Sequence, residues 1–319
     1  MAARILNIKA AERVKDPVIS QNTAHKVVRS SRDAVLGVLT FIIIVGISYT
    51  ILAPVIGIFS MSLMSRDDVF DPLVYLIPRS PSLANIRNAV QYMDYWIVLR
   101  RSLVFSSGMA VLHVIVGSLV GYGFARFRFW GKDLLFGLVI LSIVVPSQAY
   151  LVPLFMTFRF FGPTEMNLIG NYTPMILLTA TGVGIRSGLF IFIFRQFFRG
   201  MPTELSDASL IDGAGALRTF YLIMLPNAKP AIVTVSLFAL VWHYGDVFYS
   251  DLLLRGTRFI HVALGGLMQQ YMIGRGSDYM GATMVFFGGI ILVVAPVMII
   301  YVILQRQFIE GIERSGIVG

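Results

Sequence analysis

The side chains that most often perform catalysis are sparse in this sequence and form no catalytic pattern. There is no cysteine among the 319 residues, which excludes disulfides, thiolate nucleophiles and thiolate metal sites. The sequence also lacks a G-x-x-x-x-G-K-[ST] phosphate-binding loop, an H-E-x-x-H metal motif and a G-x-S-x-G nucleophile motif. The four histidines are widely separated: His25, His113, His243 and His261. We therefore expect no catalytic residue, no metal site and no bound cofactor, and for His113 a helix-packing hydrogen bond rather than a proton relay.

Arg186 is a charged residue in an otherwise apolar stretch, nine residues before Arg195. At about 1.5 Å per helical residue, that spacing places it about 13 Å along a helix from the next charge. A charge at membrane depth is costly, so it is expected to face a water-filled cavity or a partner such as Asp246. Arg186 could therefore line a path for polar or acidic solutes. Equally, it could form a structural ion pair or mark a distorted helix end.

Aromatic and polar side chains gather where a later apolar stretch ends, in the run Trp242, His243, Tyr244, Gly245 and Asp246. Aromatic rings could stack on sugar rings along a path, but Trp and Tyr also anchor membrane helices at the lipid interface. The interfacial interpretation is favoured because such belts are general. Weaker candidates for lining a path are Gln148, Tyr150 and Tyr172.

The composition indicates the class of protein to which these residues belong. Hydrophobic residues make up 56% of the chain and charged residues only 13%, which is far more apolar than an ordinary soluble domain. The net charge is +9, but the basic residues punctuate apolar stretches and do not form a stripe with interleaved aromatics. We therefore predict an all-α protein that spans the lipid bilayer several times and binds no nucleic acid.

About six transmembrane helices are predicted. Residues 1–33 are polar and basic and are expected to form a cytoplasmic tail, followed by a transmembrane permease domain over residues 34–319. Pro54 is expected to kink the first span or to mark where it leaves the bilayer. The fifth span is short and reaches full length only if Lys229 snorkels and the helix continues past Asp246. The predicted spans are residues 34–65, 102–125, 134–158, 166–185, 230–245 and 279–305.

An even number of spans places both termini on one side of the membrane. Lys and Arg are more frequent in the tail and in the loops that would share its side, mainly because of the tail itself. The positive-inside rule then favours cytoplasmic termini and a cytoplasmic loop between the fourth and fifth spans.

That loop, residues 200–229, is the longest polar and helix-forming insert between apolar stretches. Pro202 suits the first turn of a helix, and Glu204 and Asp207 follow at its dipole-positive end. Gly213 is expected to end this helix with a left-handed backbone. One face is small in its middle and could seat in a partner's groove; it consists of Leu205, Ala208, Ser209 and Asp212.

A second helical run, residues 217–224, follows in the same loop. It is expected to stop before Pro226, because proline disfavours the α conformation at Leu225.

The spacing of these residues resembles a loop motif of the inner-membrane permease subunits of binding-protein-dependent ABC importers. That motif has the form E-A-A, three residues, G, nine residues, I-x-L-P, and is matched by Asp207, Ala208 and Ser209, then Gly213, Ile223, Leu225 and Pro226. Asp for Glu and Ser for Ala are mild departures. The similarity covers about residues 102–319 and is closest in character to the carbohydrate-uptake, maltose-type branch.

The resemblance implies that the loop contains a coupling helix that docks on a cytoplasmic ATPase subunit. The residues expected to carry this contact are Glu204, Asp207, Ala208, Ser209, Asp212 and Gly213, with Leu225 and Pro226 joining them to the fifth span. It further implies a second homologous permease subunit, two ATPase subunits that use ATP and Mg, and an extracytoplasmic solute-binding protein. The expected function is import of an oligosaccharide or related polar solute across a bacterial cell membrane.

Two other classes of membrane protein would also be apolar and cross the bilayer several times. An ion-coupled secondary transporter would usually carry intramembrane acids and two related halves with broken helices, and no acid lies inside a confidently predicted span. An intramembrane enzyme would need a nucleophile with a base or a metal constellation, which the sequence lacks.

Overall fold

The computed structural model describes residues 17–316, with side chains placed for residues 35–306. The described chain is helical throughout, with one isolated β-bridge between Phe161 and Met166. The helices of the first part are α1 (Pro17–Leu63), α2 (Arg66–Phe70), α3 (Ala84–Met93), α4 (Tyr95–Arg126), α5 (Lys132–Val144), η1 (Ser147–Tyr150), α6 (Leu151–Arg159), α7 (Thr173–Ala180) and α8 (Ser187–Gly200). Those of the second part are α9 (Glu204–Ile211), α10 (Ala216–Thr219), η2 (Phe220–Met224), α11 (Leu225–Asn227), α12 (Lys229–Tyr244), α13 (Phe248–Leu253), α14 (Ile260–Gly265), α15 (Leu267–Arg275) and α16 (Tyr279–Gly316).

The chain divides into two units, residues 1–57 and residues 58–319. In the first unit, the described residues form the greater part of α1, which passes through Pro54 without a break. The helix continues on both sides of Pro54, so its expected role as a kink or as the point of exit from the bilayer stays a prediction. Residues 17–33 of the predicted tail form the first part of α1, whereas residues 1–16 lie outside the described residues.

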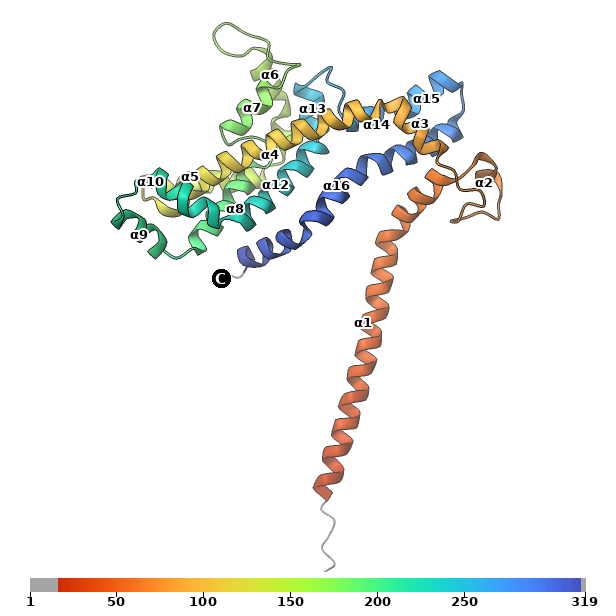
Figure 1. Ribbon diagram of the computed structural model, residues 1–319, viewed down its shortest axis with the longest axis horizontal. Coiled ribbons are helices and arrows are strands. Elements are labelled where there is room, and N and C mark those ends of the chain that lie inside the picture. The colour runs from red at the N-terminus through yellow and green to blue at the C-terminus, as the bar shows by residue number, and fades with distance from the viewer. Residues whose placement is uncertain (1–16, 317–319) are drawn as a thin grey trace, which may run out of the picture. The chain divides into compact units, whose positions relative to one another are not determined.

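The second unit is organised around α4, which packs along α8 on one side and α12 on another, while α12 also contacts α16 (Figure 1). Glycines permit the closest approach. A Cβ on Gly121 would lie 2.6 Å from Phe194 Cβ and 2.9 Å from the backbone nitrogen of Arg195, both on α8. The pair Gly117 and Gly121 is thus a site of helix packing within the chain.

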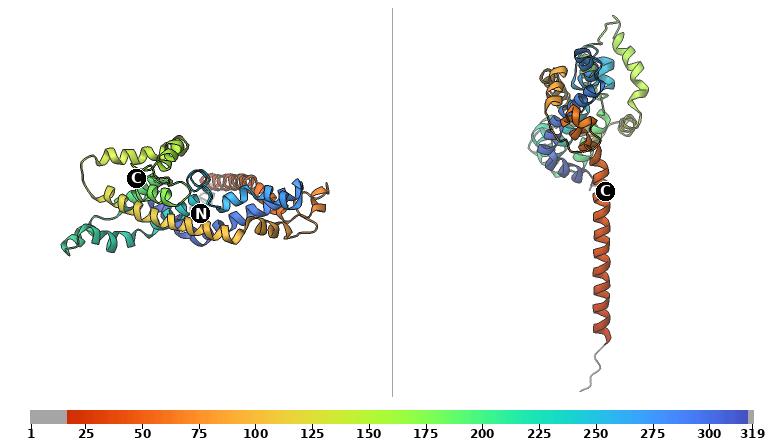
Figure 2. Two further views of the ribbon diagram at one scale, coloured as in Figure 1. Left: turned by 90° about the horizontal axis from the view of Figure 1, so that it is seen from above. Right: turned by 90° about the vertical axis from the view of Figure 1, so that its right-hand side faces the viewer.

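The same packing builds an aromatic core near one end of the unit. Phe190, Phe194 and Phe198 follow one face of α8 at helical spacing and are fully buried, together with Phe220 of η2. The helices α9 and α10 lie at this end, and α2, α3 and α15 lie at the opposite end (Figures 1 and 2). These are called below the α9 end and the α2–α3 end.

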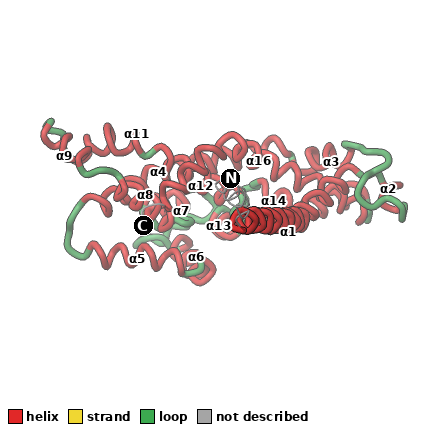
Figure 3. Tube along the Cα trace, turned by 90° about the horizontal axis from the view of Figure 1, so that it is seen from below, coloured by secondary structure: helices red, strands yellow, loops and turns green. Residues whose placement is uncertain are grey.

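Three described helical segments are long and apolar enough to cross a membrane, 35–63, Tyr95–Arg126 and 279–306, and there are five such spans if two bent helix pairs each count as one. The predicted third span is one of these pairs. It bends by 102° between α5 and η1, where Pro146 interrupts the ladder of hydrogen bonds. The helix α5 lies beside α8 along one side of the unit (Figure 3).

The prediction of a continuous fourth span over residues 166–185 is wrong. Only residues 173–180 of it form a helix, α7, and the chain then breaks before α8 begins at Ser187. Gly182 has φ +77° within this break, a conformation that favours glycine, and the helix cannot continue through it.

Charged side chains pair with one another at the α2–α3 end. The distance is 2.5 Å from Arg66 Nη2 to Asp278 Oδ1. It is 2.8 Å both from Arg79 Nη1 to Asp71 Oδ2 and from Arg258 Nη1 to Asp94 Oδ2. Asp68 is enclosed by the chain and accepts hydrogen bonds from the backbone N–H groups of Ser65, Arg79 and Ser80. Burial alone would raise the pKa of Asp68, but these donors outweigh it and the pKa is lowered.

Candidate functional site

The helix predicted near Pro202 is α9, and it is exposed at its own end of the unit. Thr203 is its N-cap, Asp212 its C-cap, and Gly213 has φ +74°. The N–H of Ala214 donates to the carbonyl of Ser209, which satisfies one of the last carbonyls of the helix. The helix begins two residues later than predicted, because Pro202 lies before the N-cap and not in the first turn, whereas the predicted glycine stop is confirmed.

Most of the residues expected to contact a partner point into solvent. Glu204, Asp207, Ala208, Asp212 and Gly213 are all exposed. Two apolar side chains join them, Leu210 at 62% and Ile211 at 87% exposed. The sequence reading missed these two, although paired large apolar residues in a polar helix are a signal for a docking surface.

Ser209 does not share that surface. Its side chain is only 2% exposed, and its hydroxyl lies 2.6 Å from the hydroxyl of Thr219 and donates to the carbonyl of Ser206. The expectation that Ser209 lies on the contact face is therefore wrong. The hydroxyl that distinguishes it from alanine fastens α9 to α10 within the chain.

The second helical run also departs from expectation. Leu225 is α-helical, with φ −66° and ψ −44°, and Pro226 lies inside α11. The preceding residues form a π turn, η2, in which the N–H of Leu225 donates to the carbonyl of Phe220. Because the regular ladder is already interrupted there, the missing N–H of Pro226 is tolerated and the helix continues to Asn227.

Arg186 stands at the break between α7 and α8. It is the N-cap of α8 with φ +58°, a left-handed conformation that is strained for a residue with a Cβ. The prediction that Arg186 lies within a helix is wrong. Of the alternatives that the sequence left open, the structure shows the distorted helix end. In the described part of the chain Arg186 forms no ion pair with Asp246; its guanidinium lies 5.5 Å from the ring centroid of Trp242.

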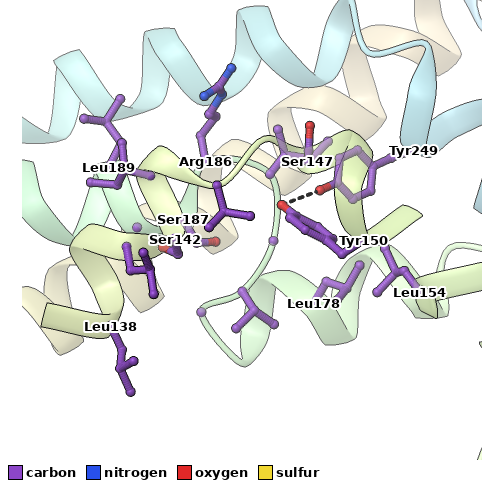
Figure 4. A pocket seen from close by; sticks show the side chains of 18 residues that line it. Leu138, Ser142, Ser147, Tyr150, Leu154, Leu178, Arg186, Ser187, Leu189 and Tyr249 are labelled. Carbon is purple, nitrogen blue, oxygen red and sulfur yellow. Dashed lines mark hydrogen bonds between the residues drawn. The ribbon is translucent and has the colours of Figure 1, made fainter. Parts of the chain in front are cut away.

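Arg186 and Tyr150 border the same cavity, of about 380 Å³, between α5, η1, α7 and α8. The hydroxyl of Tyr249 donates to that of Tyr150 at 3.0 Å, and Arg186 extends away from this pair toward α12 (Figure 4). Ser142, Ser147 and Ser187 add further hydroxyl groups to the lining. Tyr249 and these serines were missed from the sequence, because no local pattern distinguishes them from packing residues.

The remaining path candidates are dispersed. Gln148 is exposed and does not border the cavity, and Tyr172 borders a different one of about 900 Å³ along α4. Trp242 is half-buried and stacks on Phe238, with ring centroids 5.2 Å apart.

Two of the candidates are internal structural groups. Tyr244 is buried and donates its hydroxyl to the carbonyl of Val293 in α16, so it does not anchor the helix at a lipid interface as predicted. Asp246 accepts hydrogen bonds from the backbone N–H groups of Tyr249 and Ser250 and thereby caps α13.

Two histidines that are far apart in sequence meet in the core. His113 Nε2 and His243 Nε2 are 2.9 Å apart, and the hydroxyl of Ser187 lies 3.4 Å from His113 Nδ1. The expected helix-packing hydrogen bond of His113 is confirmed, and it joins α4, α12 and the start of α8. Among the described residues no group of three His, Cys, Asp or Glu side chains could hold a metal ion.

An all-helical bundle with several candidate membrane spans and an exposed acidic helix at one end is the arrangement of a multi-span membrane protein. The family described as "Binding-protein-dependent transport system inner membrane component" matches residues 113–313. The chain belongs to this family: it is an inner-membrane permease subunit of a binding-protein-dependent ABC importer and is not itself an ATPase. The importer hypothesis, rather than the ion-coupled alternative, is confirmed.

Relatives with curated names support the assignment. The chain is 30% identical over 220 residues to the maltodextrin transport system permease protein MdxG of Bacillus subtilis, covering 68% of this chain and 74% of that protein. It is 27% identical over 225 residues to the arabinooligosaccharides transport system permease protein AraQ of Halalkalibacterium halodurans, covering 70% and 75%.

A solved structure shares the fold. One chain of a bacterial ABC transporter involved in the import of the acidic polysaccharide alginate superposes with a TM-score of 0.70 at 20% identity, covering 87% of this chain and 98% of that chain.

Proposed function

We propose that this chain is one of two homologous permease subunits of an importer for an oligosaccharide or a related polar solute. Relatives that transport maltodextrin and arabinooligosaccharides support this solute class. Two ATPase subunits bind ATP and Mg on the cytoplasmic side, and an extracytoplasmic solute-binding protein delivers the solute. No phosphate-binding loop occurs in the sequence, so ATP hydrolysis belongs to the partner subunits.

The observation that carries this proposal is the exposed surface of α9. Its motif residues Asp207, Ala208 and Gly213 project from one end of the unit together with Leu210 and Ile211. We assign Glu204 and Asp212 to the same contact, as acidic side chains available to basic groups of an ATPase subunit. Leu225 and Pro226 connect this surface to α12, and Ser209 acts from within by holding α9 to α10.

In this proposal α7 and α8 together form one broken crossing, which brings the number of spans to about six. Both termini and α9 then lie in the cytoplasm, and the α2–α3 end lies outside a bacterial cell membrane. The break between α7 and α8 falls at membrane depth, where irregular backbone is tolerated only if it is buried in protein or borders a cavity.

The cavity beside this break is proposed to belong to the solute path. Arg186 and Tyr150 border it, and Trp242 holds the guanidinium of Arg186 from the side of α12. A strained residue with an uncompensated charge at such a break is typical of a functional position. An unpaired guanidinium there favours polar and acidic saccharides.

Transport then follows from a shift between two states. ATP binding closes the ATPase subunits, and α9 transmits that closure to the helices that border the path. ATP and the loaded binding protein must both bind the outward-open state better than the inward-open state, because a ligand with equal affinity for both shifts nothing.

The test is to purify the chain from its native membranes in mild detergent and to identify what accompanies it. We expect a second permease and an ATPase subunit in stoichiometric amounts, with ATP hydrolysis by the complex that is lost when the ATPase subunit is removed. If the chain is isolated alone and still transports solute after reconstitution into vesicles without ATP, the proposal is wrong.

A further inference from the structure

Arg126, the last residue of α4, reaches the three-residue link between α8 and α9. Its Nη2 donates to the carbonyl of Met201 at 2.8 Å and to the carbonyl of Pro202 at 3.3 Å. The helix α8 ends at Gly200 and α9 has its N-cap at Thr203, so these carbonyls belong to the point where the chain enters α9.

The carbonyl of Met201 lies at a helix end and is free to accept from a donor outside the helix. Met201 is the C-cap of α8. The last carbonyl groups of a helix receive no hydrogen bond from an N–H of the same helix, and they carry a partial negative charge. Pro202 has no N–H, so the link cannot be held through a backbone donor at that residue. A guanidinium suits this position because its planar N–H groups can serve neighbouring oxygen atoms and it stays charged.

The same end of α4 also contacts the far end of the loop. Tyr122 lies one turn before Arg126 and is 5% exposed, and its ring centroid is 5.1 Å from that of Phe220 in η2 and 5.7 Å from that of Phe198 in α8. The cytoplasmic end of α4 is therefore fixed to the entry of segment 200–229 through Arg126 and to its exit through Tyr122.

We infer that Arg126 is a positioning residue for energy coupling, which holds α9 and α4 together so that they move as one body. The inference rests on the proposed docking of α9 on an ATPase subunit and names the route by which that motion leaves α9. The helix α4 runs from this contact past His113 to the α2–α3 end and packs against α8 and α12 on the way. A displacement of α9 would thus reach the helices beside the cavity without bending the link at residues 201–203.

The absence of cysteine makes this inference accessible to site-directed spin labels. One label replaces Leu119, an exposed residue of α4, and the other replaces Thr203, whose side chain makes no capping hydrogen bond. The distance between them is measured in the whole importer complex in lipid nanodiscs, with and without Mg and a non-hydrolysable ATP analogue. With Arg126 present we expect one narrow distance distribution that is the same in both conditions.

In Arg126→Ala we expect the distribution to broaden and its mean to shift when the nucleotide is added, while the ATPase subunit still co-purifies. Arg126→Lys keeps one charged donor and should restore part of the narrow distribution. Arg128→Ala is the matched control, because it removes the same charge two residues later from a side chain with no hydrogen bond or ion pair among the described residues; it should behave as the native chain.

Three results would overturn the inference. The Arg126→Ala distribution could remain narrow and insensitive to nucleotide, or Arg128→Ala could produce the same change as Arg126→Ala. Loss of the ATPase subunit from Arg126→Ala would instead assign the residue to docking. If no ATPase subunit accompanies even the native chain, the coupling-loop proposal itself has failed, which the co-purification step shows separately.

Discussion

The two ends of the second unit differ in whether their charged side chains are paired within the chain. At the α2–α3 end, Arg66, Arg79 and Arg258 each pair with an aspartate, and the chain encloses Asp68 with backbone donors. At the α9 end, Glu204, Asp207 and Asp212 are exposed, and segment 200–229 contains no ion pair among the described residues.

The difference indicates where a partner is needed to complete the structure. Charges that are paired within the chain mainly fix the chain's own loops, and exposed pairs of this kind are each worth only about 0–1 kcal/mol. The acidic side chains of α9 form no ion pair among the described residues, and Leu210 and Ile211 beside them are exposed. Both charged and apolar surface is therefore available to a partner. With respect to these charged side chains, the α2–α3 end is thus largely self-sufficient, whereas the acids of the α9 end remain available to a group outside the chain.

The largest effect is expected from disrupting the α9 surface. In the double variant Asp207→Lys, Gly213→Arg, one charge is reversed and a long side chain is forced onto a residue with φ +74°. We expect at least a tenfold loss of the ATPase subunit that co-purifies with the chain, measured by quantitative mass spectrometry, with the second permease retained.

Gly213→Ala serves as the control for backbone strain. A Cβ at this position meets no atom within 4 Å, so alanine tests the left-handed conformation alone, at a cost of about 1 kcal/mol. Equal losses in Gly213→Ala and in the double variant would show that the α9 helix end, rather than its charged surface, determines docking.

A second, smaller effect is expected between the two ends, at Arg186. Arg186→Ala removes the one guanidinium beside the cavity and should lower vesicle uptake of acidic oligosaccharides about tenfold, which corresponds to about 1.4 kcal/mol. The ATPase subunit should remain bound, in contrast to the α9 variants. Arg186→Lys keeps the charge and is the matched control; unchanged uptake and solute preference in Arg186→Ala would remove this residue from the path.

The sequence was most informative where a local rule applies. Helix α9, its glycine stop and the apolar spans at α1, α4 and α16 follow from capping, left-handed backbone and span length. Long-range pairings have no such local signature. His113 and His243 are 130 positions apart and meet only because α4 and α12 pack together.

Broken helices limited the prediction of the candidate site. The apolar run before α8 has the length of a span, but Gly182 and the left-handed Arg186 divide it, and hydropathy does not report such breaks. Pro226 caused the opposite error, because a helix end was predicted where the helix continues. The π turn of η2 accommodates a residue that ordinarily ends a helix. The inward orientation of Ser209 likewise depends on Thr219, which lies on another helix.

A third effect tests how rigid the exposed α9 end is without its partner. Ser209→Ala removes the 2.6 Å contact with Thr219, and the loss of such a hydrogen bond costs about 1 kcal/mol. Amide hydrogen exchange over residues 204–219 of the purified chain should accelerate about fivefold. The double variant with Thr219→Val should add little to Ser209→Ala, since both remove the same pair; two independent, additive effects would contradict the role of this contact.

The smallest effect is expected at the self-sufficient end, at Asp278. Its carboxylate accepts the N–H of Gly281 and pairs with Arg66, and together these outweigh the opposing effect of burial and lower its pKa. A lowered pKa in the folded chain means that Asp278 stabilises the fold above its unfolded pKa of about 3.9, and that this contribution is lost as the pH falls through the folded value. Asp278→Asn should therefore lower the free energy of unfolding by less than about 1 kcal/mol at pH 7, and this difference should shrink as the pH falls below about 4.

Thermal unfolding of the purified chain between pH 7 and pH 3 measures this difference, with Asp67→Asn as the control. Asp67 is an exposed neighbour in α2 and forms no ion pair among the described residues. The ATPase subunit should co-purify with both variants as with the native chain, because neither residue lies at the α9 end. A loss of ATPase binding in Asp278→Asn would mean that the two ends are energetically linked, and the contrast between charges paired within the chain and charges left for the ATPase subunit would no longer hold.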